Sequence, residues 1–351
     1  MPGAVTVGVI ANPASGRDIR RLVSGASVFD NGEKGNMVYR LMVGLAAVGV
    51  ERVLMMPAAS GLYDSLERTL RAARSSSSGE RRPMPELALV EMTVRHDARD
   101  TIYAIAEMER SRVAAVVVLG GDGTSRIVAR HCAANVPLCT LSTGTNNTFP
   151  EMREATVAGI ATGLVATGRV GDEALRREKI LRVSLNGDAD HDCALVDVAM
   201  NSERFVGARA LWRSRNVSEI VVSSACPDSI GLSSIAGLLN PAPRDAPHGL
   251  HVRLVAPEEA ETVLTVPLAP GLVVPIGVEE VNRVEPGEMV ELTPRMGSIA
   301  LDGEREIEIG PDDEVKVRLD LNGPLTIDVG AAMREAARRG LLNGAYYRTS
   351  G

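Results

Sequence analysis

Lysine and aromatic residues are scarce in this chain of 351 residues. Only three lysines accompany 35 arginines, and Phe, Trp and Tyr together make up 3% of the residues. No lysine stands in a GxxxxGK[ST] pattern, which excludes a Walker-type phosphate loop. The low aromatic content and the lack of a basic amphipathic segment argue against a protein that works at a lipid surface.

Paired cysteines and long apolar runs are also missing. The four cysteines form no CxxC pair, so we expect neither a disulfide framework nor a structural zinc site, but buried thiols. No apolar run approaches the roughly 18 residues of a membrane span, and the opening residues MPGAVTVGVIANP lack the pattern of a signal peptide. We therefore expect a cytoplasmic protein without a membrane span.

Charge is unevenly distributed along the chain. The net charge is −7, yet residues 1–82 carry 11 basic against 7 acidic residues, and residues 245–314 carry 4 against 16. Such a distribution argues against broad nucleic-acid binding. It leaves a mildly basic N-terminal region that suits a small anionic ligand.

The first half of the chain alternates apolar, β-branched runs with helix-like stretches, which predicts a doubly wound, mostly parallel α/β sheet. The expected strands are residues 5–10, 53–56, 87–92, 113–119 and 136–141, and the expected helices are residues 36–48, 63–73, 98–108, 125–134 and 151–167.

Closely spaced strands follow residue 178 and predict an antiparallel β-sandwich, with one helix near residues 205–213. Residues 170–178 read as a polar connection, and a last helix is expected at residues 331–339, before Gly340. We expect an α/β nucleotide-binding domain over 1–168, a β-rich substrate domain over 169–330, and a C-terminal helix and tail over 331–351 that packs back on the first domain.

The strongest local pattern is GGDGT, which directly follows the apolar strand expected at residues 113–119. In such sheets ligands bind beyond the carboxyl ends of the strands. The glycines allow close approach of a ligand to the backbone, and Thr124 is expected to cap the next helix, where a phosphate could dock. The candidate residues here are Gly120, Gly121, Asp122, Gly123 and Thr124.

Two further segments follow other strands of the same sheet. NPASG follows the first strand and supplies Asn12, Pro13, Ser15 and Gly16, and STGTNNTF follows the fifth strand and supplies Gly144, Thr145, Asn146 and Asn147. Together with GGDGT, these segments resemble the motifs of the superfamily of NAD kinases and diacylglycerol kinases. The segments IANPASGRDIRRLVSGASVF and FVGARALW are most similar to its ATP-NAD kinase-like family, in the group of acetoin catabolism X proteins.

The second half carries two further segments that resemble this superfamily. Asn201 and Glu203 resemble its Asn-Glu pair, although Ser202 separates them, and Asp302 and Glu304 resemble its DGE segment. The resemblance implies that these four residues bind substrate. A hairpin turn at Asp302-Gly303 is the alternative interpretation of the second segment.

The resemblance implies an ATP-dependent kinase that transfers a γ-phosphoryl group to a hydroxyl. The cofactors would be ATP and Mg²⁺, Asp122 would be the catalytic base, and the 2'-hydroxyl of NAD would be the first candidate acceptor, which would place the enzyme in NADP biosynthesis. Relatives of this kind are commonly homo-oligomers.

Two alternatives remain open. NPASG and GTNNTF favour a lipid or polyol kinase of the diacylglycerol kinase type. Ile127 stands where lipid kinases usually have Glu, with Arg126 beside it, and together with the split Asn-Ser-Glu this favours a catalytically weak nucleotide-binding regulator linked to acetoin catabolism. Lys34 is expected in a loop from which it could reach a ligand.

Metal ligands are not firmly assigned. The segment GDADHDC at residues 187–193 is rich in acids but fits an ordinary hairpin, and HGLH at residues 248–251 lacks a third ligand nearby.

Overall fold

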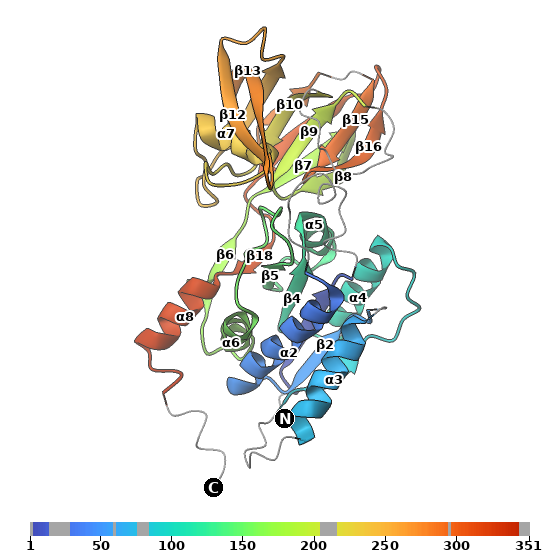
Figure 1. Cartoon of the computed structure of the whole chain (residues 1–351), viewed down its shortest axis with the longest axis vertical. Helices are drawn as coiled ribbons and strands as arrows, with labels where there is room; N and C mark the ends of the chain where they lie inside the picture. Colours follow the sequence, from blue (N-terminus) through green and yellow to red (C-terminus); the bar gives the residue numbers. More distant parts are fainter. Residues whose placement is uncertain are drawn as a thin grey trace.

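We describe a computed structural model of the chain, covering residues 3–13, 29–58, 61–75, 84–203, 216–293 and 296–343. It has an α/β half and a β-rich half (Figure 1). The side chains of residues 305 and 306 are not described. Ser15, Gly16 and the helix expected near 205–213 lie outside the described residues.

The α/β half is built on a seven-stranded sheet with the order β3-β2-β1-β4-β5-β18-β6. Its strands are β1 (Thr6–Ala11), β2 (Arg52–Met55), β3 (Glu86–Leu89), β4 (Ala115–Gly120), β5 (Leu138–Ser142), β6 (Leu175–Arg177) and β18 (Leu325–Ile327). All neighbours pair in parallel except β18 and β6. The predicted parallel sheet is confirmed. The segment expected as a polar connection instead contains the short 3₁₀ helix η1 (Asp172–Ala174) and β6, because Leu175–Arg177 pairs with β18.

Helices cover both faces of this sheet. One face packs on α2 (Asn31–Ala47), α3 (Leu62–Ser75), α6 (Ala155–Ala166) and α8 (Val329–Arg338), and the other on α4 (Ala98–Arg110) and α5 (Asp122–His131). Helix α2 begins earlier than expected because Asp30 caps it, accepting a hydrogen bond from Glu33 N at 2.7 Å. Gly340 follows α8 with a φ of 62°, as expected for a glycine that ends a helix.

The β-rich half consists of two antiparallel sheets. One has the order β12-β13-β11-β10-β9-β15-β16 and the other the order β14-β17-β7-β8. The strands are β7 (Ile180–Leu185), β8 (Asp188–Ala194), β9 (Asp197–Asn201), β10 (Val217–Val222), β11 (Gly249–Val255), β12 (Thr262–Ala269), β13 (Leu272–Val284), β14 (Met289–Leu292), β15 (Gly297–Leu301), β16 (Glu304–Ile309) and β17 (Val315–Asp320). A shared apolar core between the sheets confirms the predicted sandwich.

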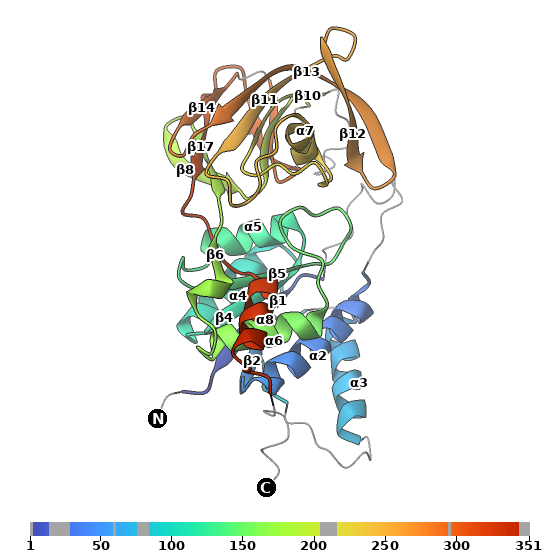
Figure 2. The same cartoon turned by 90° about the vertical axis from the view of Figure 1, so that its left-hand side faces the viewer.

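One short helix in the β-rich half was not predicted. Helix α7 (Leu232–Leu239) packs its Leu232, Ile235 and Ala236 on the outer face of the larger sheet. Its eight residues LSSIAGLL are too short and too uniformly apolar to show a helical period. Figure 2 shows α7 beside β11 and β12.

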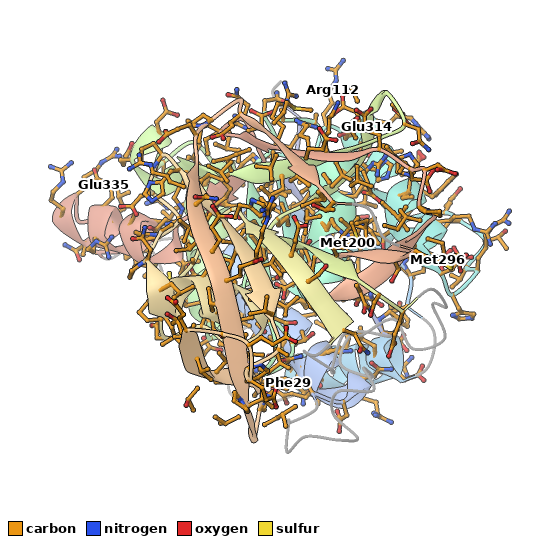
Figure 3. All side chains as sticks on the ribbon, turned by 90° about the horizontal axis from the view of Figure 1, so that it is seen from above. Phe29, Arg112, Met200, Met296, Glu314 and Glu335 are labelled. Atoms are coloured by element: carbon orange, nitrogen blue, oxygen red, sulfur yellow. The ribbon has the colours of Figure 1, made fainter. Side chains whose placement is uncertain are left out.

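The chain passes between the halves twice. It leaves after β6 and returns with β18, which pairs beside it, and α8 then packs on α6. Figure 3, seen from the β-rich side, shows α8 with Glu335 projecting at the margin. We propose that the α/β unit comprises residues 3–178 and 324–343, and the β-rich unit residues 179–323.

Helices α2 and α6 cross at glycines. A Cβ at Gly159 would lie 2.3 Å from Leu41 O, and a Cβ at Gly44 would lie 2.2 Å from Thr156 O. Backbone atoms cannot yield as a flexible side chain can, so these helices approach this closely only without side chains there.

Gly159→Ala should therefore lower the free energy of unfolding by about 1–3 kcal/mol, as overpacking does, despite the better helix propensity of alanine. Urea denaturation measures the change. Gly330→Ala in α8 is the matched control, because its Cβ would meet only side-chain ends, Arg334 at 3.1 Å and the Asp328 carboxylate at 3.3 Å, and no backbone atom. Equal stability of the two variants would contradict the proposed role of the glycine crossing.

Candidate functional site

The GGDGT loop joins β4 to α5, the helix on the side of the α/β half that faces the β-rich half (Figures 1 and 2). Gly121, not Thr124, is the N-cap of α5, so the predicted capping role of Thr124 is wrong. Thr124 lies in the first turn and folds over the end of β4, where a Cβ at Gly120 would approach its side chain to 2.7 Å. Its Oγ1 accepts a hydrogen bond from Asn12 Nδ2 at 2.9 Å, which joins two of the predicted motifs.

Asn12 and Pro13 follow β1 and are anchored by Lys34. The Lys34 side chain is buried, and its Nζ donates to Asn12 O at 3.0 Å and to Pro13 O at 3.4 Å. Lys34 lies in the first turn of α2, so its expected place in a loop is wrong. The ammonium group supports the backbone at the start of the NPASG segment.

The loop after β5 approaches the GGDGT loop through Asn147. Asn147 Nδ2 donates to Ser142 Oγ at 2.8 Å, which closes the loop on itself. A Cβ at Gly121 would lie 2.8 Å from Asn147 Oδ1, so only glycine leaves this approach open. Gly144 is buried, Asn146 is half-buried, and Thr145 Oγ1 is buried without a hydrogen-bond partner among the described residues.

Asp122 binds the far end of this loop. Its carboxylate accepts the backbone N–H of Thr148 at 3.1 Å and that of Phe149 at 2.7 Å. The predicted catalytic residue therefore also holds the turn at residues 148–149, which ties the second and third motifs together.

The β-rich half contributes Asp302 and Glu304. Asp302 and Gly303 both have positive φ, 53° and 76°, and form the tight turn between β15 and β16, so the predicted hairpin is present. A Cβ at Gly123 would lie 3.2 Å from a Glu304 carboxylate oxygen, so Glu304 lies against the GGDGT loop.

Asp302 is itself buried. Its Oδ1 accepts the N–H of Leu195 at 2.9 Å and of Val196 at 2.7 Å. Burial raises the pKa of Asp302 well above its ordinary value of 3.8, and the nearby Asp197 and Asp122 carboxylates raise it further, while the Arg126 guanidinium opposes these effects. Asp302 and Gly303 therefore form the hairpin turn, and the Asp302 carboxylate also faces Arg126 on α5.

Arg126 supplies a positive charge that we did not predict as part of the site. Its buried side chain on α5 lies 3.3 Å from Asp192 Oδ1 and 3.8 Å from Asp302 Oδ2. Arg130, one turn later, also pairs with Asp192. The only signal in the sequence is the arginine beside Ile127, in the helix expected after GGDGT.

Asn201 is the last residue of β9, and Glu203 follows two residues after it. Asp197, at the start of β9, lies next to Asp302. Asn201 is four residues further along the strand, which corresponds to about 13 Å at the usual rise of a strand. Asn201 Oδ1 accepts the N–H of Glu203, and Glu203 Oε1 accepts from Asn216 Nδ2 at 2.6 Å. Asn201 Nδ2 is buried and has no hydrogen-bond partner within the described part of the chain. These two residues thus form a separate group at the other end of β9.

The described residues include no group of three or more His, Cys, Asp or Glu side chains placed to hold a metal. Residues 188–193 form β8, which follows the turn at Asn186-Gly187 as the hairpin interpretation predicts. All four thiols are free; Cys139 and Cys193 are buried, whereas Cys132 and Cys226 are only half-buried. Burial raises the pKa of Cys139 to about 11 and that of Cys132 and Cys193 to about 12. In the described ranges, no helix is long and apolar enough to span a membrane.

Comparison with known proteins gives two matching family models. Residues 7–170 match the ATP-NAD kinase N-terminal domain, and residues 179–322 match the acetoin catabolism protein X C-terminal domain. The chain is 47% identical over 343 residues to acetoin catabolism protein X of Cupriavidus necator, covering 97% of this chain and 94% of that protein. The chain belongs to the acetoin catabolism protein X family. The resemblance to the ATP-NAD kinase-like family is thereby confirmed.

A solved structure also matches this member of the family over most of its length. It is an NAD kinase from Archaeoglobus fulgidus in complex with ATP, 12% identical, with a TM-score of 0.39, covering 97% of this chain and all of that one.

Proposed function

We propose that the protein binds ATP at the carboxyl edge of the α/β sheet and transfers its γ-phosphoryl group to a hydroxyl of a small molecule. One observation carries the proposal: direct contacts bring together motifs that are far apart in the sequence. Asn12 contacts Thr124, Asp122 binds the turn after β5, and Glu304 lies against Gly123. The match of residues 7–170 to an ATP-NAD kinase domain supports it.

The phosphates of ATP would lie against backbone N–H groups at the N-terminus of α5, within residues 121–124, beside Asn12 and Pro13 of the NPASG segment. Asn146 or Asn147 would hydrogen-bond ribose or phosphate. The Thr145 hydroxyl, which has no partner among the described residues, gives the same loop a further polar group. Asn201 and Glu203 would position the acceptor, for which NAD is our first candidate. Asn201 Nδ2 is buried without an acceptor among the described residues, which supports such a role, since a buried donor costs free energy without an acceptor.

In the reaction, the acceptor oxygen forms a bond to the γ-phosphorus and the bond from that phosphorus to the bridging oxygen of ATP breaks, so ADP leaves. Asp122 accepts the proton of the acceptor hydroxyl. Mg²⁺ neutralises phosphate charge when it is bound with the nucleotide. The phosphates would hold it together with the carboxylates of Asp122 and Glu304, which both lie at the GGDGT loop.

A nucleotide-binding regulator without turnover is the second candidate. The Asp122 carboxylate already accepts two backbone N–H groups, which gives it a structural role that needs no chemistry. Ser202 separates the pair that resembles Asn-Glu, in agreement with reduced catalysis.

Incubation of the purified protein with ATP, Mg²⁺ and a panel of NAD, NADH, diacylglycerol and sphingoid bases tests the two candidates. Mass spectrometry should detect a phosphorylated product from NAD. Absence of any phosphorylated product, while ATP still raises the melting temperature, would contradict the kinase and support the regulator.

Gly121→Ala should weaken ATP binding by at least about tenfold, because the new Cβ would push Asn147 away from the loop. Isothermal titration calorimetry measures the dissociation constant. Gly310→Ala is the matched control, since its Cβ would meet only Asp313 at an ordinary 3.6 Å. Unchanged ATP affinity in Gly121→Ala would place the nucleotide elsewhere.

A further inference from the structure

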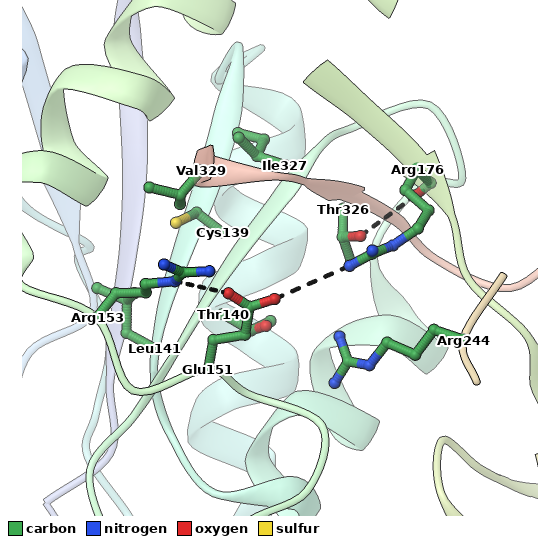
Figure 4. Close-up of a pocket in the computed structure, with 10 residues that line it drawn as sticks. All are labelled: Cys139, Thr140, Leu141, Glu151, Arg153, Arg176, Arg244, Thr326, Ile327 and Val329. Atoms are coloured by element: carbon green, nitrogen blue, oxygen red, sulfur yellow. Dashed lines mark hydrogen bonds and ion pairs between the residues drawn. The ribbon is translucent and has the colours of Figure 1, made fainter. Parts of the chain in front are cut away.

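Arg244 reaches from the β-rich half to the turn at residues 148–149 of the α/β half. It lies between α7 and β11, and its Nη2 donates to Thr148 O at 3.0 Å and also to Phe149 O. Its guanidinium carbon lies 4.8 Å from the centre of the Phe149 ring. Figure 4 shows Arg244 at the border of a pocket that Glu151 and Arg176 also line.

The opposite side of the same turn binds Asp122. The carbonyl of Thr148 and the N–H of Phe149 belong to one planar peptide unit. Arg244 donates to the carbonyl oxygen of that unit, and the N–H of the same unit, from Phe149, donates to Asp122 Oδ1 at 2.7 Å. A charged donor on the carbonyl polarises the peptide and strengthens the hydrogen bond of its N–H. Arg244 and the Asp122 carboxylate are thus joined through a single rigid group.

Arg244 is in turn fixed by the two residues where the chain enters the β-rich half. Its Nη1 lies 3.7 Å from the buried carboxylate of Glu178. The buried Lys179 donates to Pro243 O at 3.0 Å and to His248 O at 2.8 Å, on both sides of Arg244. Lys179 thus fixes the segment that carries Arg244 within the β-rich half, while Glu178, Thr148 and Phe149 are the contacts of Arg244 in the α/β half.

We propose that Arg244 is a positioning residue that orients the Thr148–Phe149 peptide, and through it the Asp122 carboxylate, when the two halves are docked. The effect of Arg244 on phosphoryl transfer rests on the proposed function. The coupling between Arg244 and the turn does not depend on it.

Hydrogen exchange of the two amides that bind Asp122 tests the coupling. In Arg244→Met, exchange of the Thr148 and Phe149 amides should accelerate at least about tenfold, whereas amides of β10 and β11 keep their protection. Arg253→Met is the control, because Arg253 pairs with Glu280 on the exposed face of the same half. Unchanged exchange at residues 148 and 149 would overturn the proposal.

Activity provides the second readout. Where the wild type phosphorylates an acceptor, Arg244→Met should lower kcat with little change in the dissociation constant of ATP, and Arg244→Lys should restore part of the rate. A loss of ATP affinity with normal kcat would overturn the positioning role. If the wild type binds no ATP, the proposed function fails, and the exchange rates still decide the role of Arg244.

Discussion

Arg126→Met should lower the free energy of unfolding by about 3–5 kcal/mol near pH 8, the range observed when one partner of a buried ion pair is removed. Arg126 is buried between the halves and faces the carboxylates of Asp192 and Asp302. Methionine fills a similar volume but leaves Asp302, which is buried, without its nearest positive charge. Chemical denaturation followed by circular dichroism measures the change.

The pH dependence identifies Asp302 as the origin of the loss. Because the pKa of Asp302 is raised on folding, the native state binds more protons than the unfolded state above the ordinary value of 3.8, and stability falls as pH rises through this window. Removal of Arg126 raises that pKa further. The penalty of Arg126→Met should therefore decrease between pH 8 and pH values approaching 4.

Asp302→Asn in the Arg126→Met background should recover much of the lost stability. Asparagine keeps the Oδ1 acceptor for Leu195 and Val196 and tolerates the φ of 53° at this turn. Arg110→Met is the matched control, since Arg110 forms an exposed pair with Glu107 on α4. A penalty that does not change with pH, or no recovery in the double variant, would contradict this account.

Asp122→Asn should reduce phosphoryl transfer by about 10²–10⁴-fold, the usual contribution of a positioned general base. The amide oxygen can still accept the N–H of Phe149, so the turn at residues 148–149 should stay in place. The loss then reports the missing proton acceptor. A single-turnover assay with ATP and the acceptor found by mass spectrometry measures it.

Asp122→Ala is the comparison that separates the two roles of this side chain. Alanine removes both the base and the hydrogen bonds to Thr148 and Phe149, so rapid exchange of these amides should accompany the loss of rate. If Asp122→Asn retains the wild-type rate, Asp122 has the structural role alone and the regulator gains support.

The α/β sheet followed from local patterns. Its strands are short apolar runs and its helices show a regular apolar period, and each of the three motifs follows the end of a different strand. The carboxyl ends of parallel strands share one edge, so their meeting could be expected from the sequence.

Contacts between distant segments could not be predicted in this way. Arg126 and Arg244 act across the junction of the halves, and nothing in their neighbouring residues indicates a partner more than 60 positions away. The predicted cap of α5 is wrong for a local reason. Thr124 is a good capping residue, but Gly121 has the extended backbone that a cap requires. Strand β6 is only three residues long and depends on pairing with β18.

The two chain segments that connect the halves, at residues 178–179 and 323–324, lie side by side. Glu178 N donates to Pro324 O at 2.9 Å, and Gly323 N donates to Glu178 O at 3.0 Å. The β-rich unit is therefore an insertion whose two ends touch. An exchange of residues 179–323 for another module would leave β18 and α8 in place, and the edge of the sheet that carries the three motifs would not need to be rebuilt.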